Sequence, residues 1–160
     1  MLNSYIPVLV IGFRRAEEIV EVFRSLECFQ PPRLYLAMDG PRSDKEKVLT
    51  ENARSSALKA VTWKCDLQLL FSNSHIGCAD FVVKAITWFF SYEESGLILE
   101  DDILIHPSFI KFIQTYRSSR RFDCICACTY ESALSHQHSS LARHHPFASY
   151  IPSIWGWYTC

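Results

Sequence analysis

Short, continuously apolar segments alternate with longer segments whose apolar residues recur at helical spacing, and this alternation constrains the fold more than any other feature. The clearest amphipathic pattern spans residues 78–90. Strands that are apolar on both faces are typical of a parallel sheet covered by helices. The sequence therefore predicts one α/β domain over residues 1–160, with a mostly parallel sheet and helices on both faces. The expected strands lie at 6–13, 34–38, 67–71, 96–99 and 124–128.

The charge and the distribution of apolar residues exclude several kinds of partner. The formal net charge is −1 over 160 residues, which does not favour nucleic acid or an anionic membrane. The apolar run at 6–13 is too short to span a bilayer, and no positive charge precedes it as in a signal peptide. Seven cysteines, an odd number, indicate reduced thiols. We therefore expect a cytoplasmic protein with no membrane span and no nucleic-acid partner.

Polar residues follow three of the predicted strands, at the point where each strand ends. They are Gly12–Arg15, Asp39–Gly40 and Glu100–Asp102. In open α/β sheets, ligands bind outside the carboxyl ends of the strands. Three consecutive carboxylates repel one another, and a divalent cation would offset that repulsion while also binding phosphate oxygens. The acidic motif alone fits a solvated strand end that caps the following helix equally well, so both interpretations stay open at this point.

Four segments of the sequence, in chain order, carry motifs of one known family. They are Pro7–Arg15, His75–Cys78 with Ala85–Phe90, Gly96–Asp102 with His106–Phe109, and Ile154–Trp157. Together they resemble the nucleotide-diphospho-sugar transferases of the GT-A fold, such as the bacterial HlpA-like glycosyltransferases. The alpha-1,3-mannosyl-glycoprotein N-acetylglucosaminyltransferases are more distantly similar. The resemblance implies a Rossmann-like GT-A domain that is incomplete at its C-terminus, because family members continue beyond their Trp-Gly-Trp segment.

The resemblance implies a metal site at the acidic motif. Asp102 would ligate Mn²⁺ or Mg²⁺, and Asp101 would support the metal or contact the ribose. Glu100 would face the donor sugar. The family's catalytic base lies beyond the matched segments, so the resemblance assigns no catalytic residue in this chain.

The resemblance also implies a nucleotide site next to the metal. Gly12, Phe13 and Arg14 would line the nucleotide, and Asp39 would hydrogen-bond the base. His75 stands where bacterial relatives usually have Asn, on the phosphate side. Arg14 and Arg15 also fit a surface pair at the start of a helix, but the position that they share with the family favours contact with the nucleotide.

The expected activity is transfer of a sugar from a UDP- or GDP-sugar to an acceptor, with Mn²⁺ or Mg²⁺. Trp155 and Trp157 would lie near the donor sugar or the acceptor entrance, and this aromatic end makes a homo-oligomer plausible. Two alternatives remain. A nucleotidyltransferase would normally carry a Gly-rich basic loop after the first strand, where this chain has only Gly12–Arg15. A non-catalytic nucleotide-binding remnant is the second alternative.

Alternating cysteines near several histidines suggest a further metal site. Cys124, Cys126 and Cys128 precede four histidines within residues 136–145. Alternation places the three thiols on one face of a strand, which is also the pattern of a core strand. Their spacing differs from the paired Cys-x-x-Cys ligands of structural zinc sites. We therefore expect this strand to be buried and free of metal.

Overall fold

The computed structural model describes the backbone of residues 5–116, 124–126 and 156–159. The predicted cysteine strand is β5, described over Cys124–Cys126. Cys128, the histidines of 136–145 and Trp155 lie outside the described residues, so the zinc alternative stays untested. The remaining strands are β1 (Val8–Gly12), β2 (Arg33–Met38), β3 (Asp66–Phe71), β4 (Ser95–Glu100) and β6 (Gly156–Thr159). The helices are α1 (Ala16–Glu27), α2 (Asp44–Ala60), α3 (Cys78–Phe90) and α4 (Pro107–Tyr116).

The strands form one sheet in the order β3-β2-β1-β4-β6-β5. The first four are mutually parallel, and β6 pairs antiparallel with both β4 and β5. The predicted α/β class with a mostly parallel sheet is therefore confirmed, and the arrangement is Rossmann-like. β6 was not expected from the sequence. It brings the backbone of Trp157 opposite Leu97, which places Gly156 and Trp157 beside the strand that ends in the acidic motif.

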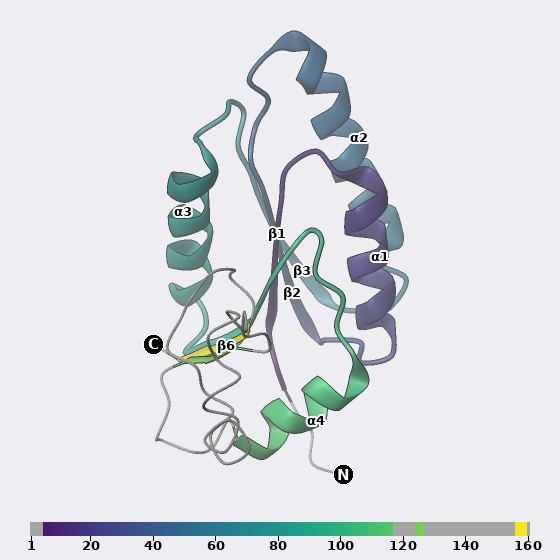
Figure 1. Cartoon of the computed structure of the whole chain (residues 1–160), viewed down its shortest axis with the longest axis vertical. Coiled ribbons are helices and arrows are strands. Elements are labelled where there is room, and N and C mark those ends of the chain that lie inside the picture. Colours follow the sequence, from purple (N-terminus) through teal and green to yellow (C-terminus); the bar gives the residue numbers. More distant parts are fainter. Residues whose placement is uncertain (1–4, 117–123, 127–155, 160) are drawn as a thin grey trace, which may run out of the picture.

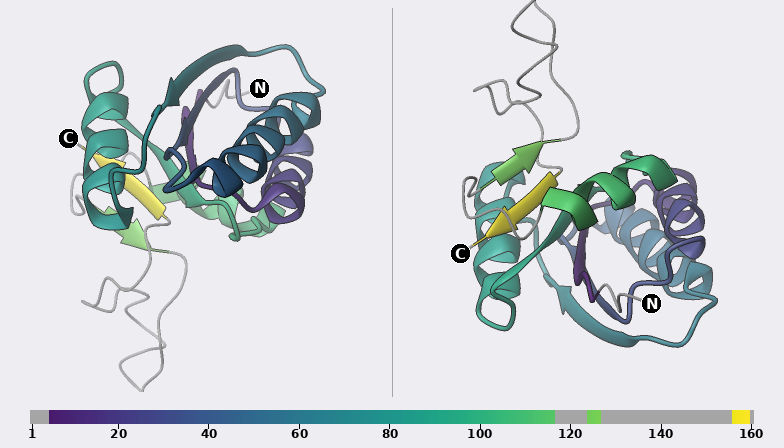
Figure 2. Two further views of the ribbon diagram at one scale, coloured as in Figure 1. Left: turned by 90° about the horizontal axis from the view of Figure 1, so that it is seen from above. Right: turned by 90° about the horizontal axis from the view of Figure 1, so that it is seen from below.

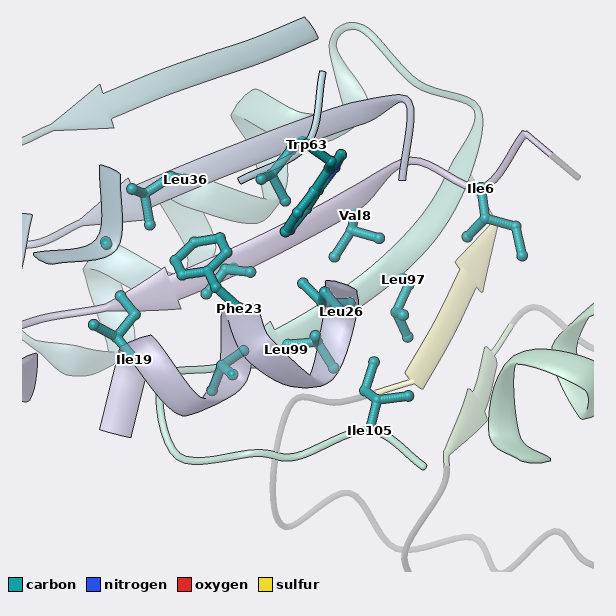
Figure 3. Close-up of a cluster of buried hydrophobic side chains, with 14 of the residues drawn as sticks. Ile6, Val8, Ile19, Phe23, Leu26, Leu36, Trp63, Leu97, Leu99 and Ile105 are labelled. Carbon is teal, nitrogen blue, oxygen red and sulfur yellow. The ribbon is translucent and has the colours of Figure 1, made fainter. Parts of the chain in front are cut away.

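Helices cover both faces of the sheet, as predicted (Figures 1 and 2). Alternate residues of each parallel strand point to opposite sides, so each strand contributes to two cores. α1, α2 and α4 pack against the side that includes Val8, Leu36 and Leu99 (Figure 3). α3 packs against the other side, on Leu9 and Ile98. Among the described residues, no helix is long and apolar enough to cross a membrane.

The local sequence explains where the helices begin and which faces they bury. α1 buries Ile19, Val22, Phe23 and Leu26, which lie on one stripe of a helix. α2 has a weaker apolar face, and Ser43 caps it by accepting a hydrogen bond from the Glu46 amide at 3.4 Å.

Candidate functional site

The carboxyl ends of β1 and β4 meet at the point where the chain changes direction along the sheet. From β1 the chain builds β2 and β3 on one side, and it then returns through α3 to place β4 on the other side of β1. Ile11 pairs with Glu100 in this register, so the segments after both residues leave the sheet side by side. In open α/β sheets such a switch point is where ligands bind.

Asp101 is the buried member of the acidic motif and is tied to the end of β1. Asp101 is 3% exposed, and its Oδ2 accepts a hydrogen bond from the Phe13 amide at 3.1 Å. Gly12 leaves room for it, because a Cβ on Gly12 would lie 3.2 Å from the Asp101 Cβ. Burial raises the pKa of the Asp101 carboxyl, while hydrogen bonds from Arg15 and the Phe13 amide act in the opposite direction.

Arg15 offsets part of the charge of the acidic motif, a role that the sequence motifs did not predict for it. Its Nη1 lies 2.7 Å from Asp102 Oδ2, and its Nη2 contacts Asp101 Oδ1. The Asp102 side chain is 40% exposed, so it is the more accessible of the two carboxylates. Glu100, the last residue of β4, is half-buried. Arg15 is the residue that immediately precedes α1.

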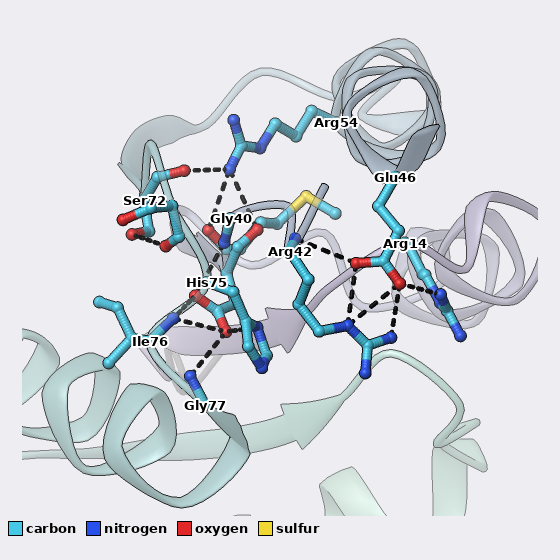
Figure 4. Close-up of polar contacts among 12 residues, drawn as sticks. Arg14, Gly40, Arg42, Glu46, Arg54, Ser72, His75, Ile76 and Gly77 are labelled. Atoms are coloured by element: carbon cyan, nitrogen blue, oxygen red, sulfur yellow. Dashed lines mark hydrogen bonds and ion pairs between the residues drawn. The ribbon is translucent and has the colours of Figure 1, made fainter. Parts of the chain in front are cut away.

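Arg14, which was expected to line the nucleotide, contacts α2 instead of the acidic motif. Its Nη1 pairs with Glu46 Oε1, and Arg42 Nε donates to Glu46 Oε2 at 2.9 Å (Figure 4). Both guanidiniums lie near the Phe13 ring, with centroid distances of 5.6 Å for Arg14 and 5.5 Å for Arg42. The hydrogen bonds from Arg42 are the main cause that lowers the pKa of Glu46 to about 2.

Asp39, at the end of β2, is buried and holds the loop that leads into α3. Its carboxylate accepts hydrogen bonds from the amides of Gly40 at 2.7 Å, Ile76 at 3.0 Å and Gly77 at 3.2 Å. His75 Nδ1 lies 2.7 Å from Asp39 Oδ2. This carboxylate is therefore engaged by groups of its own chain, and its predicted contact with a base stays a prediction.

A half-buried arginine on α2, Arg54, joins the ends of β2 and β3. Arg54 Nη2 donates to the carbonyl oxygens of Ser72 at 2.6 Å and Asp39 at 3.1 Å (Figure 4). Gly40 approaches the same loop so closely that a Cβ would lie 2.5 Å from the backbone of Ser74. These contacts hold the Asp39–His75 pair in place at the carboxyl edge.

Phe13 connects the two groups of predicted residues. Its amide donates to Asp101, and its ring lies 5.4 Å from the His75 ring, centroid to centroid. Gly12, Phe13, Asp39, His75 and the acidic motif thus share one edge of the sheet. The backbone of Trp157 lies in β6, and its side chain lies outside the described part of the structure.

The donor set at the acidic motif fits a cation that is only partly held by protein. Within the described parts of the chain, no three His, Cys, Asp or Glu side chains are arranged to hold a metal ion. Mg²⁺ is usually bound through one or two carboxylates together with substrate phosphates rather than in an all-protein cage. The accessible Asp102, with Asp101 behind it, matches that mode of binding.

The chain matches no family model, and no curated protein matches it. The fold and the site therefore define only the class of domain to which the chain belongs. It is a Rossmann-like α/β domain with an acidic pair and an arginine at its switch point.

Proposed function

We propose that this chain is the nucleotide-sugar-binding domain of a metal-dependent glycosyltransferase of the GT-A type. The observation that carries the proposal is the pair of carboxylates at the switch point. Asp101 is buried and bonded to the loop after β1, while Asp102 is exposed at the same edge. A pair with one anchored and one accessible member suits a ligand that brings its own phosphates.

Asp102 would hold Mn²⁺ or Mg²⁺ together with the diphosphate of the donor. When bound, the cation would neutralise the charge that develops on the nucleoside diphosphate as it leaves. Asp101 would hold the loop after β1 in place by accepting the hydrogen bond from the Phe13 amide. Glu100 would face the donor sugar. The protein's part in this step is to place Asp102 and to keep the loop rigid.

Arg15 would exchange its partners when the donor binds. Its side chain is 46% exposed and bonded to both carboxylates, so it offsets part of their charge. If Asp102 held the cation, Arg15 would be released from that carboxylate and its guanidinium could turn to a phosphate oxygen. Glu17 and Glu18 occupy the first turn of α1. The negative charges of Glu17 and Glu18 repel an anion at this end of α1. A phosphate bound at the start of α1 would therefore need Arg15 and the cation as well.

Phe13 and His75 would form the base side of the site. Two guanidiniums lie near the ring of Phe13, and the imidazole of His75 lies beside it. Because His75 Nδ1 faces Asp39, its Nε2 points away from that carboxylate and can contact the nucleotide. Arg14, held by Glu46, would line the outer rim. Asp39 supports this arrangement through the loop amides, whether or not it also contacts the base.

Thermal unfolding with added nucleotides tests the proposal directly. The midpoint should rise with UDP or GDP only when Mn²⁺ is present, and CMP should have a smaller effect, because ligand binding to the folded state shifts unfolding by mass action. Stabilisation by UDP or GDP that is equally large in a chelator would contradict a metal-bridged donor.

A second experiment separates the remaining alternatives. Consumption of UDP-sugar or GDP-sugar, with or without acceptor, is expected of a transferase. A preference for nucleoside triphosphate with release of pyrophosphate would instead indicate a nucleotidyltransferase. Metal-dependent nucleotide binding without any donor consumption would support the non-catalytic alternative.

A further inference from the structure

β3 forms one outer edge of the sheet, away from the candidate site. It pairs with β2 on one side, and no described strand pairs with its other side (Figure 2). The strand Asp66–Phe71 is regular over six residues and contains no Pro, Lys or Arg. Natural edge strands usually carry such residues, or a bulge, to prevent pairing with another chain. This edge lacks those protections.

The backbone groups of β3 alternate between β2 and the outer side. The Asp66 amide donates to the Pro32 carbonyl at 2.8 Å, and the Ser72 amide donates to the Met38 carbonyl at 3.0 Å. In a regular strand the N–H and C=O of one residue point the same way, and the direction alternates along the chain. Residues 66, 68, 70 and 72 therefore face β2. Leu67, Leu69 and Phe71 direct their N–H and C=O groups outward.

The same three residues share one face of the sheet. Leu67 and Phe71 pack partly buried against the core formed with α1, α2 and α4. Leu69 lies between them and is 45% exposed, which is high for a leucine inside a sheet. The helices on this face therefore leave the middle of the edge strand uncovered. The outward backbone groups and an uncovered leucine coincide at one position.

We propose that a second copy of this chain pairs antiparallel with β3 across a two-fold axis at Leu69. In this register Leu69 lies opposite its own copy, and Leu67 lies opposite Phe71. All three belong to the set with outward backbone groups, so each opposed pair can exchange hydrogen bonds. Residues directly opposite in such a pair project to the same face, so the apolar side chains meet one another. The two sheets become one continuous sheet.

Self-pairing suits this strand because the register opposes no like charges. Asp66, which is exposed, falls opposite Ser72 of the second copy, and Lys64 falls opposite Ser74. A contact across a two-fold axis must be self-complementary. β3 meets that condition, because Leu69 lies at the axis and the Asp66 carboxylate lies at one end of the strand. The interface is one strand wide and therefore small. The dimer is expected to dissociate on dilution, as weak interfaces do.

Sedimentation velocity over a range of concentrations tests the assembly. The wild-type chain should move from 18.5 kDa towards twice that mass as concentration rises. Leu69→Lys should stay monomeric, because two ammonium groups would face each other at the axis. Val83→Lys is the matched control, since Val83 is 64% exposed on α3. It should dimerise as the wild type does. A dimer that persists unchanged in Leu69→Lys would overturn the proposal, as would a wild type that stays monomeric.

Amide hydrogen exchange of the wild-type protein tests the register without any substitution. In dilute solution the amides of Leu67, Leu69 and Phe71 should exchange quickly, while those of Gln68 and Leu70 are protected by β2. At high concentration all five should be protected, each outward amide at least about tenfold more than in dilute solution. Protection that does not depend on concentration, or that appears elsewhere on the surface instead, would show that β3 is not the interface.

Discussion

Arg15 and Asp102 face each other across the carboxyl edge of the sheet, with Nη1 of the arginine 2.7 Å from Oδ2 of the aspartate. The second guanidinium nitrogen contacts the buried Asp101. One side chain thus offsets part of the charge of two consecutive carboxylates, and it belongs to the residue that immediately precedes α1. The acidic motif therefore has a counter-charge within the chain, and under the proposed function a metal ion would have to replace Arg15 at Asp102.

Replacing Arg15 should destabilise the fold through Asp101. In Arg15→Gln the buried Asp101 carboxylate keeps the Phe13 amide but loses its charged partner. Since Arg15 is about half exposed, we expect the free energy of unfolding to fall by about 1–3 kcal/mol. Urea titration at neutral pH measures this loss. The control is Arg24→Gln, whose guanidinium pairs with Glu21 at an exposed position of α1 and should change stability very little.

The stability of the wild-type protein should decline as Asp101 ionises. Burial raises the pKa of this carboxyl above its ordinary value of about 3.9. An acid with a higher pKa in the folded chain binds its proton more tightly there. The free energy of unfolding therefore falls as pH rises from the unfolded pKa through the folded pKa. Asp101→Asn removes this ionisation.

Parallel urea titrations of the wild type and Asp101→Asn from about pH 3 to about pH 7 measure the effect. The variant should gain stability relative to the wild type as the pH increases, and the gain should level off above the folded pKa. A difference that is constant over this range would show that Asp101 has the same pKa in the folded and unfolded chains.

Gly40→Ala should loosen the loop that carries His75. The new methyl group would lie 2.5 Å from the backbone of Ser74, so this loop must move. We expect a loss of about 1–3 kcal/mol in stability. We also expect faster exchange of the Ile76 and Gly77 amides, which donate to Asp39. Ser74→Ala changes an exposed side chain and leaves its backbone in place, so it should shift stability by less than about 0.5 kcal/mol.

Most of the fold follows from local patterns in the sequence. The runs at 34–38 and 67–71 predict β2 and β3 to within one residue. The run in β2 is continuously apolar because that strand is covered on both faces. β6 was not predicted, since Gly156–Thr159 is short and acquires its conformation by pairing with β4. The β-propensity of four residues predicts a strand poorly when the contacts that stabilise the strand come from residues distant along the chain.

The site was predicted at the level of strand ends but not at the level of side-chain partners. Topology alone brings the ends of β1 and β4 together, and the acidic motif marks that edge. Which of two adjacent arginines turns towards it depends on how α1 leaves the strand. Arg15 pairs with Asp101 and Asp102, whereas Arg14 pairs with Glu46 on α2. Consecutive residues differ in direction here, and the sequence has no signal that resolves the choice.

The metal assignment rests on Asp102, and a charge-only substitution can isolate it. Asp102→Asn keeps the shape of the side chain but removes the oxygen charge that a hard cation requires. Asp101, being buried and bonded to Phe13, remains to hold the loop. We therefore expect the fold to be retained and UDP binding in the presence of Mn²⁺ to weaken at least about tenfold, or about 1.4 kcal/mol.

Calorimetry with UDP, with Mn²⁺ and then with a chelator, gives the comparison. Glu94→Gln also removes one negative charge, but Glu94 is exposed just before β4, at the opposite end of that strand from Asp102. It should bind UDP as the wild type does, because a general change in net charge has no specific effect at the far edge. In the chelator, wild type and both variants should be equally weak, since none then has a cation to bridge the phosphates. If Asp102→Asn and the wild type bind equally well with Mn²⁺, the cation is held elsewhere or not at all, and the carboxylate pair serves only to anchor Arg15.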